Sequence, residues 1–243
     1  MFEQFPKTRP KLPPEMAKIY TQHYQENRRG ETQASALAQR MERWLHDRVA
    51  EDVGSEVTPR STLELGAGTL NQLHHEPVRG PYDIVEPFRA LFEGSPELSR
   101  IGNVYEDISE VPLDATYDRI TAVATFEHIC NLPEVVARSG LLLTPEGTLR
   151  ASIPSEGTFL WKLGWTLTTG IEFRRRYGME YETLMKHEHV NDAGEIEELL
   201  RYFFRDVTQK VCGLSRAISF YQFYACGNPD LSRCRHYLDS IAS

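Results

Sequence analysis

A short glycine-containing segment carries the clearest chemical signal in the sequence. The apolar run Leu63-Glu64-Leu65 is followed at once by Gly66-Ala67-Gly68. Glycines directly after a strand let the backbone turn sharply and approach a ligand closely, and ligands of open α/β sheets bind at the carboxyl ends of strands. The segment therefore predicts a nucleotide-like cofactor in contact with Glu64, Gly66, Ala67 and Gly68.

The residues after the loop narrow the kind of cofactor. A dinucleotide fingerprint would continue as GxGxxG, but Thr69-Leu70-Asn71 follows Gly68 and the last glycine is missing. A phosphate-cradling GxxxxGK loop is absent from the sequence as well. Glu86 ends the next predicted strand, about 20 residues beyond the loop, where a carboxylate can accept hydrogen bonds from ribose hydroxyls. These features indicate a ribose-containing cofactor and disfavour NAD(P).

Several segments together resemble the class I S-adenosylmethionine (SAM)-dependent methyltransferases, in particular the small-molecule, methyltransferase-11-like group. The loop is similar to that family's E/D-x-G-x-G-x-G motif, except that Leu70 replaces the third glycine. Phe126-Glu127-His128-Ile129 resembles its "LEHI" string, and residues 142–148 resemble its turn before the fifth strand. The resemblance covers about residues 61–154 and implies SAM as cofactor, with S-adenosylhomocysteine (SAH) as product.

The resemblance also implies roles for individual residues. The glycine loop would contact the methionine part of SAM, and Glu64 would hold its ammonium. Asp107 would face the adenine amino group, with Ile108 packed on the ring. The remaining cofactor contacts are expected from Pro87 beside Glu86, from Phe126 under the sulfonium, and from an N-terminal helix that closes over the cofactor with Tyr20 and Arg28.

Three histidines are candidate bases for a hydroxyl acceptor, which usually must lose a proton. His128 lies in the cleft-forming motif, where it could instead form only local hydrogen bonds. His187 and His189 flank Glu188, and an extended backbone would place both on one side; surface histidines near a helix cap are the competing interpretation. A lone HxH lacks the further ligands that a metal site needs, so no metal is predicted.

The surrounding pattern predicts the elements that position these residues. Helices are expected at 15–26, 32–53 and 132–143, and another begins at a cap near 191–195. Alternating strands and helices favour a parallel sheet with helices on both faces. We therefore expect a Rossmann-like class I methyltransferase fold with a mostly parallel seven-stranded sheet. Its strands are predicted at 62–65, 82–86, 103–105, 117–124, 147–153, 206–212 and 218–226.

The organisation of the chain follows from the same pattern. Residues 1–56 are expected to form an N-terminal arm and helical cap, and residues 57–243 a SAM-binding domain. The strand and helix alternation stops after Pro154, so about 155–190 is predicted to be a helical insertion or lid. Its aromatic residues are expected to form a small core of their own, and some could line an acceptor pocket.

Composition limits the function classes. A net charge of −8 disfavours nucleic acid as the partner, and without an apolar run of about 18 residues no membrane span is predicted. The four cysteines show no CxxC pairing, and the N-terminus lacks an apolar signal segment, which together favour the cytoplasm.

The sequence thus predicts a SAM-dependent methyltransferase acting on a small-molecule or glycan-like acceptor, preferably at oxygen. The alternatives are a non-catalytic SAM-binding partner subunit and, less favoured, an NAD(P)-dependent oxidoreductase. Neither the identity of the acceptor nor the oligomeric state is predicted.

Overall fold

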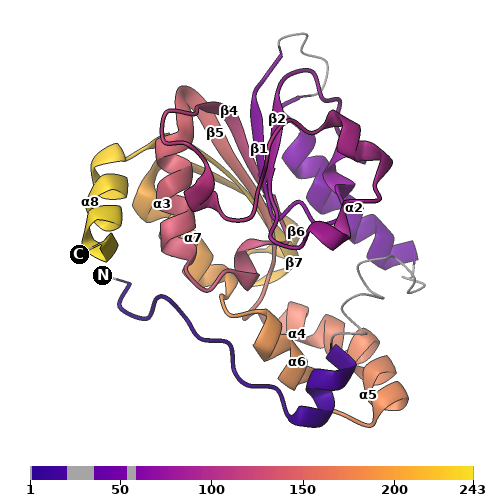
Figure 1. Ribbon diagram of the computed structural model, residues 1–243. Coiled ribbons are helices and arrows are strands. Elements are labelled where there is room, and N and C mark those ends of the chain that lie inside the picture. Colours follow the sequence, from indigo (N-terminus) through magenta and orange to yellow (C-terminus); the bar gives the residue numbers. More distant parts are fainter. Residues whose placement is uncertain (1, 21–35, 54–58, 243) are drawn as a thin grey trace.

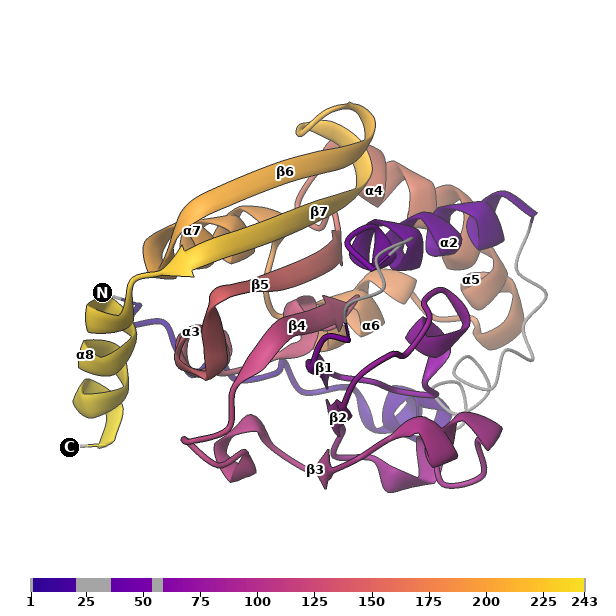
Figure 2. The ribbon, with the colours of Figure 1, turned by 90° about the horizontal axis from the view of Figure 1, so that it is seen from above.

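The chain folds around one seven-stranded sheet. The computed structural model describes residues 2–20, 36–53 and 59–242. The strands run in the order β3-β2-β1-β4-β5-β7-β6, as Figures 1 and 2 show. Strands β1 to β5 pair in parallel, whereas β7 pairs antiparallel with both β5 and β6. Their bounds are Thr62–Leu65, Tyr82–Val85, Val104–Tyr105, Tyr117–Val123, Leu143–Pro154, Phe204–Ser215 and Ile218–Pro229 for β1 to β7.

The central strands are short and apolar because both faces of the sheet are covered. All four residues of β1 and of β2 are buried. Figure 1 shows α3 (Leu132–Leu142), α7 (Ala193–Phe203) and α8 (Leu231–Ala242) on one side of the sheet, and α2 (Ala36–Ala50) on the opposite side. The predicted fold class is confirmed, although α8 was not predicted.

Local sequence signals explain several helix boundaries. Asp192 caps α7 by accepting a hydrogen bond from the Glu195 backbone, and the Glu195 carboxylate accepts one in return from the Asp192 backbone. This capping box confirms the predicted helix start. Pro133 lies in the first turn of α3, where its missing N–H costs nothing. Of the two predicted N-terminal helices, the described residues contain a helix over 14–20 and α2 itself.

The residue at the third glycine position has a structural role of its own. A short 3-10 helix, Asn71–His74, follows the glycine loop. Leu70 precedes it with a left-handed backbone, φ 66°, and its side chain is completely buried among Leu73, Tyr82 and Phe92. Leu70 therefore anchors the glycine loop to the core. This packing role explains why the sequence has leucine where the family motif has its third glycine.

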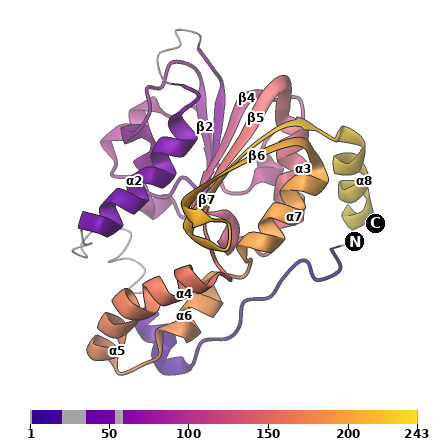
Figure 3. The ribbon, with the colours of Figure 1, turned by 180° about the vertical axis from the view of Figure 1, so that it is seen from behind.

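The insertion is helical, as predicted. It contains α4 (Phe159–Trp165), a π-helical turn (Thr166–Gly170), α5 (Ile171–Tyr177) and α6 (Tyr181–Glu188). Figures 1 and 3 show these helices gathered with residues 14–20 beyond one end of the sheet. Phe173 and Leu184 form a small core with Met16, and Tyr20, Tyr177 and Tyr181 are among the residues packed against it. The N-terminal residues and the insertion thus share one core.

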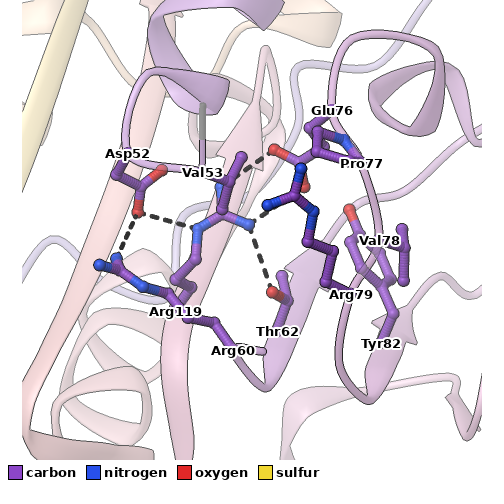
Figure 4. Close-up of a pocket in the computed structure, with 10 residues that line it drawn as sticks. All are labelled: Asp52, Val53, Arg60, Thr62, Glu76, Pro77, Val78, Arg79, Tyr82 and Arg119. Atoms are coloured by element: carbon purple, nitrogen blue, oxygen red, sulfur yellow. Dashed lines mark hydrogen bonds and ion pairs between the residues drawn. The ribbon is translucent and has the colours of Figure 1, made fainter. Parts of the chain in front are cut away.

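A buried ionic cluster ties α2 to the amino ends of the strands (Figure 4). The Arg119 guanidinium, on β4, donates to Asp52 at 2.9 Å, to Glu76 at 3.0 and 3.1 Å, and to the Val49 carbonyl at 3.2 Å. Arg150, on β5, also donates to the Val49 carbonyl, at 2.8 Å. Two cations at the carbonyl end of α2 suit its dipole and satisfy its last acceptors.

Among the described residues, no helix combines the length and apolar character that crossing a membrane would require.

Candidate cofactor and acceptor site

A pocket of about 850 Å³ opens at the carboxyl ends of β1, β2 and β4. Its volume is in the range of small-molecule and cofactor sites. The α2 side of the wall contributes Leu45 and His46, and the N-terminal side contributes Arg9. The pocket brings together most of the predicted site residues: Tyr20, Glu64, Gly66, Ala67, Gly68, Glu86, Pro87, Asp107, Ile108 and His128.

The glycine loop follows β1 as predicted. Gly66 and Gly68 both have left-handed backbones, with φ 66° and 54°, a conformation that only glycine adopts without strain. A Cβ atom on Gly66 would lie 2.5 Å from the Thr125 methyl carbon and 2.6 Å from its hydroxyl oxygen. The loop therefore needs glycine for its backbone conformation and for the close approach of the chain that follows β4.

The Glu86 carboxylate is buried and held in a fixed orientation. One oxygen accepts a hydrogen bond from the Gly68 backbone N–H at 2.8 Å, and the other accepts from the Phe88 N–H at 3.0 Å. Each carboxylate oxygen can accept a second hydrogen bond. Because the group also lines the pocket, it can receive two hydroxyls of a bound ribose.

Glu64 lies deeper than its predicted role requires. Its carboxylate is 3% exposed and accepts a hydrogen bond from the Tyr82 hydroxyl at 2.9 Å. Burial raises the pKa of Glu64 to about 8, and the Tyr82 hydrogen bond offsets only part of that effect. Without a cation beside it, the group therefore holds a proton at neutral pH.

The pKa of Glu64 predicts how stability depends on pH. The folded protein keeps a proton that the unfolded chain, at an ordinary pKa of 4.5, has already released. The stabilisation that comes from this retained proton is fully present below pH 4.5 and is lost as the pH rises through 8. Across this range, rising pH should lower the free energy of unfolding by up to about 1.4 kcal/mol per pH unit. Urea unfolding of wild type and Glu64→Gln at pH 5.5, 6.5 and 7.5 measures it; parallel pH profiles for the two proteins would contradict it.

Asp107 and Ile108 both line the pocket, and each also has a structural contact that the motif did not indicate. The Asp107 carboxylate caps the 3-10 helix Ile108–Glu110 by accepting a hydrogen bond from the Ser109 N–H at 2.8 Å. The Ile108 side chain is buried in the main core and also lines the pocket.

Phe126 is a correction to the predicted cofactor contacts. Its side chain is completely buried in the main core and does not line the pocket. After β4 the chain turns into a 3-10 helix, Phe126–His128, which directs Phe126 inward. Thr125 and His128 line the pocket instead.

The N-terminal arm contacts the site as predicted, but through partly different residues. The Tyr20 hydroxyl donates a hydrogen bond to the Glu188 carboxylate, and both residues line the pocket. Arg9 was not predicted, yet its guanidinium donates to the carbonyls of His128 at 2.7 Å, His187 at 2.8 Å and Glu188 at 3.1 Å. Arg28 lies outside the described residues.

The three candidate histidines separate into a pair and an outlier. The rings of His128 and His189 meet edge to face, 4.9 Å between centroids. His187 instead contacts the Pro10 carbonyl at 2.8 Å and the Tyr20 ring at 5.3 Å, and it does not line the pocket. The predicted extended geometry is wrong because α6 continues to Glu188, and only His189 follows it. His187 is therefore corrected from a candidate base to a contact of the N-terminal arm.

Carboxylates surround the histidine pair, and the sequence did not single them out. The His189 Nδ1 atom lies 2.7 Å from a Glu156 carboxylate oxygen, which also accepts a hydrogen bond from the Trp161 indole. Burial opposes the charged form of His189, but Glu156, Glu127 and Glu188 outweigh it and raise the pKa of His189. Glu156 and His189 are 33 residues apart, so no local spacing could have revealed the pair.

Comparison with known proteins identifies the fold. No protein-family model and no curated protein matches the chain. Among solved structures, the plantazolicin methyltransferase BpumL, in complex with SAH and a monoazolic desmethylPZN analogue, is 15% identical with a TM-score of 0.59, over 88% of this chain and 91% of its own.

Two other similar structures support the same assignment. A SAM-dependent methyltransferase from Thermotoga maritima, a possible histamine N-methyltransferase, is 14% identical with a TM-score of 0.54, covering 87% of this chain and 99% of its own. The N-methyltransferase NodS from Bradyrhizobium japonicum, in complex with SAH, is also 14% identical, with a TM-score of 0.54. The match covers 82% of this chain and 90% of its own. The chain therefore has the Rossmann-like fold of the class I SAM-dependent methyltransferases.

Proposed function

We propose that the protein is a SAM-dependent methyltransferase that methylates a hydroxyl oxygen of a small-molecule or glycan-like acceptor. The observation that carries the proposal is the pocket at the glycine loop, where the Glu86 carboxylate and two left-handed glycines come together. The similar structures bind SAH in some cases, which supports the same cofactor here.

The residues present fit SAM better than a dinucleotide. The loop leads into a 3-10 helix of four residues, which offers little of the helix dipole that binds a pyrophosphate. Glu64 and Glu86 bring acidic groups to the wall, which suits a cofactor with an ammonium and a sulfonium. An ammonium beside Glu64 would favour its ionised form.

The chain's contribution to the chemistry is mainly positioning. When bound, SAM supplies a methyl group on a sulfonium, which is already a good leaving group. Glu86 would hold the ribose, and the glycine loop and Glu64 the methionine end. Residues 14–20 and the insertion cover the far side of the pocket through the contact between Tyr20 and Glu188, which would exclude water. The acceptor proton would pass to the cluster that contains His128 and His189.

The acceptor side supports a polar substrate rather than an extended apolar one. His128 and Glu188 line the pocket, with His189, Glu156 and Trp161 directly behind them. Hydrogen-bonding groups at the pocket wall are suited to a sugar-like or small polar acceptor.

The location and the domain division are part of the same proposal. The four cysteines are unpaired, which supports the proposed cytoplasmic location. The chain is proposed to divide into an N-terminal cap (1–56) and a SAM-binding domain (57–243).

Calorimetric titration of SAM and SAH tests the cofactor assignment. We expect wild type to bind both at micromolar concentration. Glu86→Ala should weaken binding at least tenfold, about 1.4 kcal/mol, because it removes the ribose acceptor. Glu106→Ala, an exposed acidic neighbour at the same pocket, is the matched control and should keep wild-type affinity. No binding by well-folded wild type would refute the proposal, and NADH would then be titrated.

Removing histidines tests the preference for oxygen. If the pair accepts the acceptor proton, His128→Ala and His189→Ala should each lower kcat by about 10²–10⁴-fold and leave SAH affinity within twofold. His187→Ala, one residue from Glu188 but outside the pair, should keep its turnover. Full turnover in all three variants would argue against a hydroxyl acceptor. Tight SAH binding without turnover on any acceptor would favour a non-catalytic SAM-binding subunit.

A further inference from the structure

Three potential metal ligands converge behind the pocket wall: Glu127, His128 and His189. One ligand atom of each lies within 4.8 Å of the ligand atoms of the other two. Glu127 and His128 come from the 3-10 helix after β4, whereas His189 follows α6 some 60 residues later. The sequence offered only the HxH pair 187 and 189; the structure replaces His187 with two ligands from another segment.

The backbone holds the two ligand segments in register. The N–H groups of Val190 and Asn191 donate to the Glu127 carbonyl at 2.8 and 3.2 Å. The buried Asn191 side chain bridges the same turn, donating to the carbonyls of Phe126 and Ile129, both at 2.8 Å. These contacts fix the relative position of the ligands before any ion binds, which lowers the entropic cost of binding one.

Each imidazole is also oriented through its Nδ1 atom. His128 Nδ1 lies 3.0 Å from the Glu188 carbonyl, which can only accept, so Nδ1 carries the proton. His189 Nδ1 lies 2.7 Å from the Glu156 carboxylate, itself held by the Trp161 indole. Metal-ligating histidines almost always donate their other ring N–H to a carboxylate or carbonyl in this manner. The Nε2 atom of His128 lies 3.8 Å from a Glu127 oxygen.

We propose that Glu127, His128 and His189 bind a first-row divalent metal ion of the Zn²⁺ type at the acceptor end of the pocket. Two imidazoles and one carboxylate are a ligand set used by catalytic zinc and other first-row metal sites, which leave a position open for substrate or water. Metal–ligand bonds of about 2.0–2.2 Å place two ligands of a tetrahedral ion roughly 3.3 Å apart. Side-chain rotation would therefore have to bring the three groups closer by up to about 1.5 Å.

The charge of the surroundings favours a cation here. Glu127 is 1% exposed, and Glu156 and Glu188 add two more carboxylates around the two imidazoles. Arg9 and Lys7 are nearby cations among the described residues. The Arg9 guanidinium contacts carbonyl groups, and Lys7 contacts the Val190 carbonyl and the Glu195 carboxylate, rather than the carboxylates of the cluster. The competing occupant is a proton on His189, whose pKa the same carboxylates raise. The metal proposal and the protonated-histidine alternative differ in one measurable property, binding of the ion itself.

The metal site is independent of the proposed function, but a role for the metal ion in catalysis rests on that function. His128 lines the cofactor pocket, so an ion on its Nε2 atom would lie at the pocket wall. There it would polarise an acceptor hydroxyl and lower its pKa. The Glu188 carboxylate, which also lines the pocket, would then be the group placed to take the proton.

Titration of Zn²⁺ into the metal-free full chain, followed by calorimetry, tests the site. We expect one equivalent to bind to wild type. His189→Ala and Glu127→Gln should each weaken it at least tenfold. Glu156→Gln should weaken it about 10–100-fold, the usual effect of losing a partner behind a metal-ligating histidine. His187→Ala, which removes the neighbouring histidine outside the cluster, should keep wild-type affinity.

Co²⁺ serves as a second probe because its visible absorption reports the ligand set. A tetrahedral spectrum that His189→Ala abolishes and His187→Ala preserves supports the site. Absence of binding by wild type, equal losses in both histidine variants, or a thiolate-to-cobalt band that assigns the ion to a cysteine overturns the proposal. SAH affinity of the same samples confirms that each variant is folded. Retained SAH binding without metal binding would reject this site and leave the proposed function standing.

Discussion

Replacing Arg119 with methionine is expected to lower the free energy of unfolding by about 3–5 kcal/mol, the usual cost of removing one partner of a buried ion pair. Arg119 is 1% exposed and neutralises Glu76, whose carboxylate is also buried. Without the guanidinium, Glu76 would remain buried without its main counter-charge, and the Val49 carbonyl at the end of α2 would lose a donor. Equilibrium urea unfolding with a two-state fit measures the change.

Arg60→Met is the matched control because Arg60 shares the Asp52 partner. Its side chain is about one-third exposed and its contact with Asp52 is 3.3 Å long, so solvent screens the pair. We expect a loss below about 1 kcal/mol. If Arg119→Met costs no more than Arg60→Met, burial of the cluster does not make its ion pairs more stabilising than an exposed pair.

Gly66→Ala is expected to weaken SAH binding about 100-fold, or about 2.7 kcal/mol. The new methyl group would lie within 2.6 Å of both branches of the Thr125 side chain, and the residue would also have to keep a left-handed backbone, at about 1–2 kcal/mol. The loop would relieve both effects by moving away from the cofactor position. Calorimetry gives the affinity, and thermal unfolding shows whether the fold is retained.

Two further variants separate the clash from the backbone effect. Gly178→Ala has nearly the same φ, 68°, but nothing lies within 4 Å of its added carbon, and it is far from the loop in the sequence. It should lose stability and keep wild-type SAH affinity. Gly66→Ala combined with Thr125→Ala removes most of the clash and should recover part of the lost affinity. No recovery would mean that Thr125 is not what the loop must avoid.

The parts of the fold that the sequence predicted are those with local causes. The glycine loop follows a buried strand, and the capping box at Asp192 precedes an amphipathic helix; each is encoded within a few residues. The strands and their mostly parallel pairing followed from the alternation of strands and helices. These signals also placed Glu86 correctly, because a strand end and a fixed distance from the loop define its position.

The misplaced residues depend on contacts between distant segments. Phe126 belongs to a matching motif, but a 3-10 helix rotates its side chain into the core. Leu70 was noted as a missing glycine, yet its partners Tyr82 and Phe92 lie on the next strand and beyond. Arg9 and Glu156 had no local signal, since their partners are 119–179 and 33 residues away. Sequence periodicity contains no information on such pairings.

The N-terminal arm has a consequence for the order in which the protein becomes functional during synthesis. Phe2 packs against the rings of Tyr202 and Phe203, and Lys7 pairs with Glu195. Phe2 and Lys7 leave the ribosome before these partners, which emerge almost 200 residues later. The nascent chain can form the early strands and the glycine loop while the wall behind His128 is still incomplete. The contacts of the arm therefore form late, because contacts between residues far apart in the sequence can close only after the intervening chain has been made.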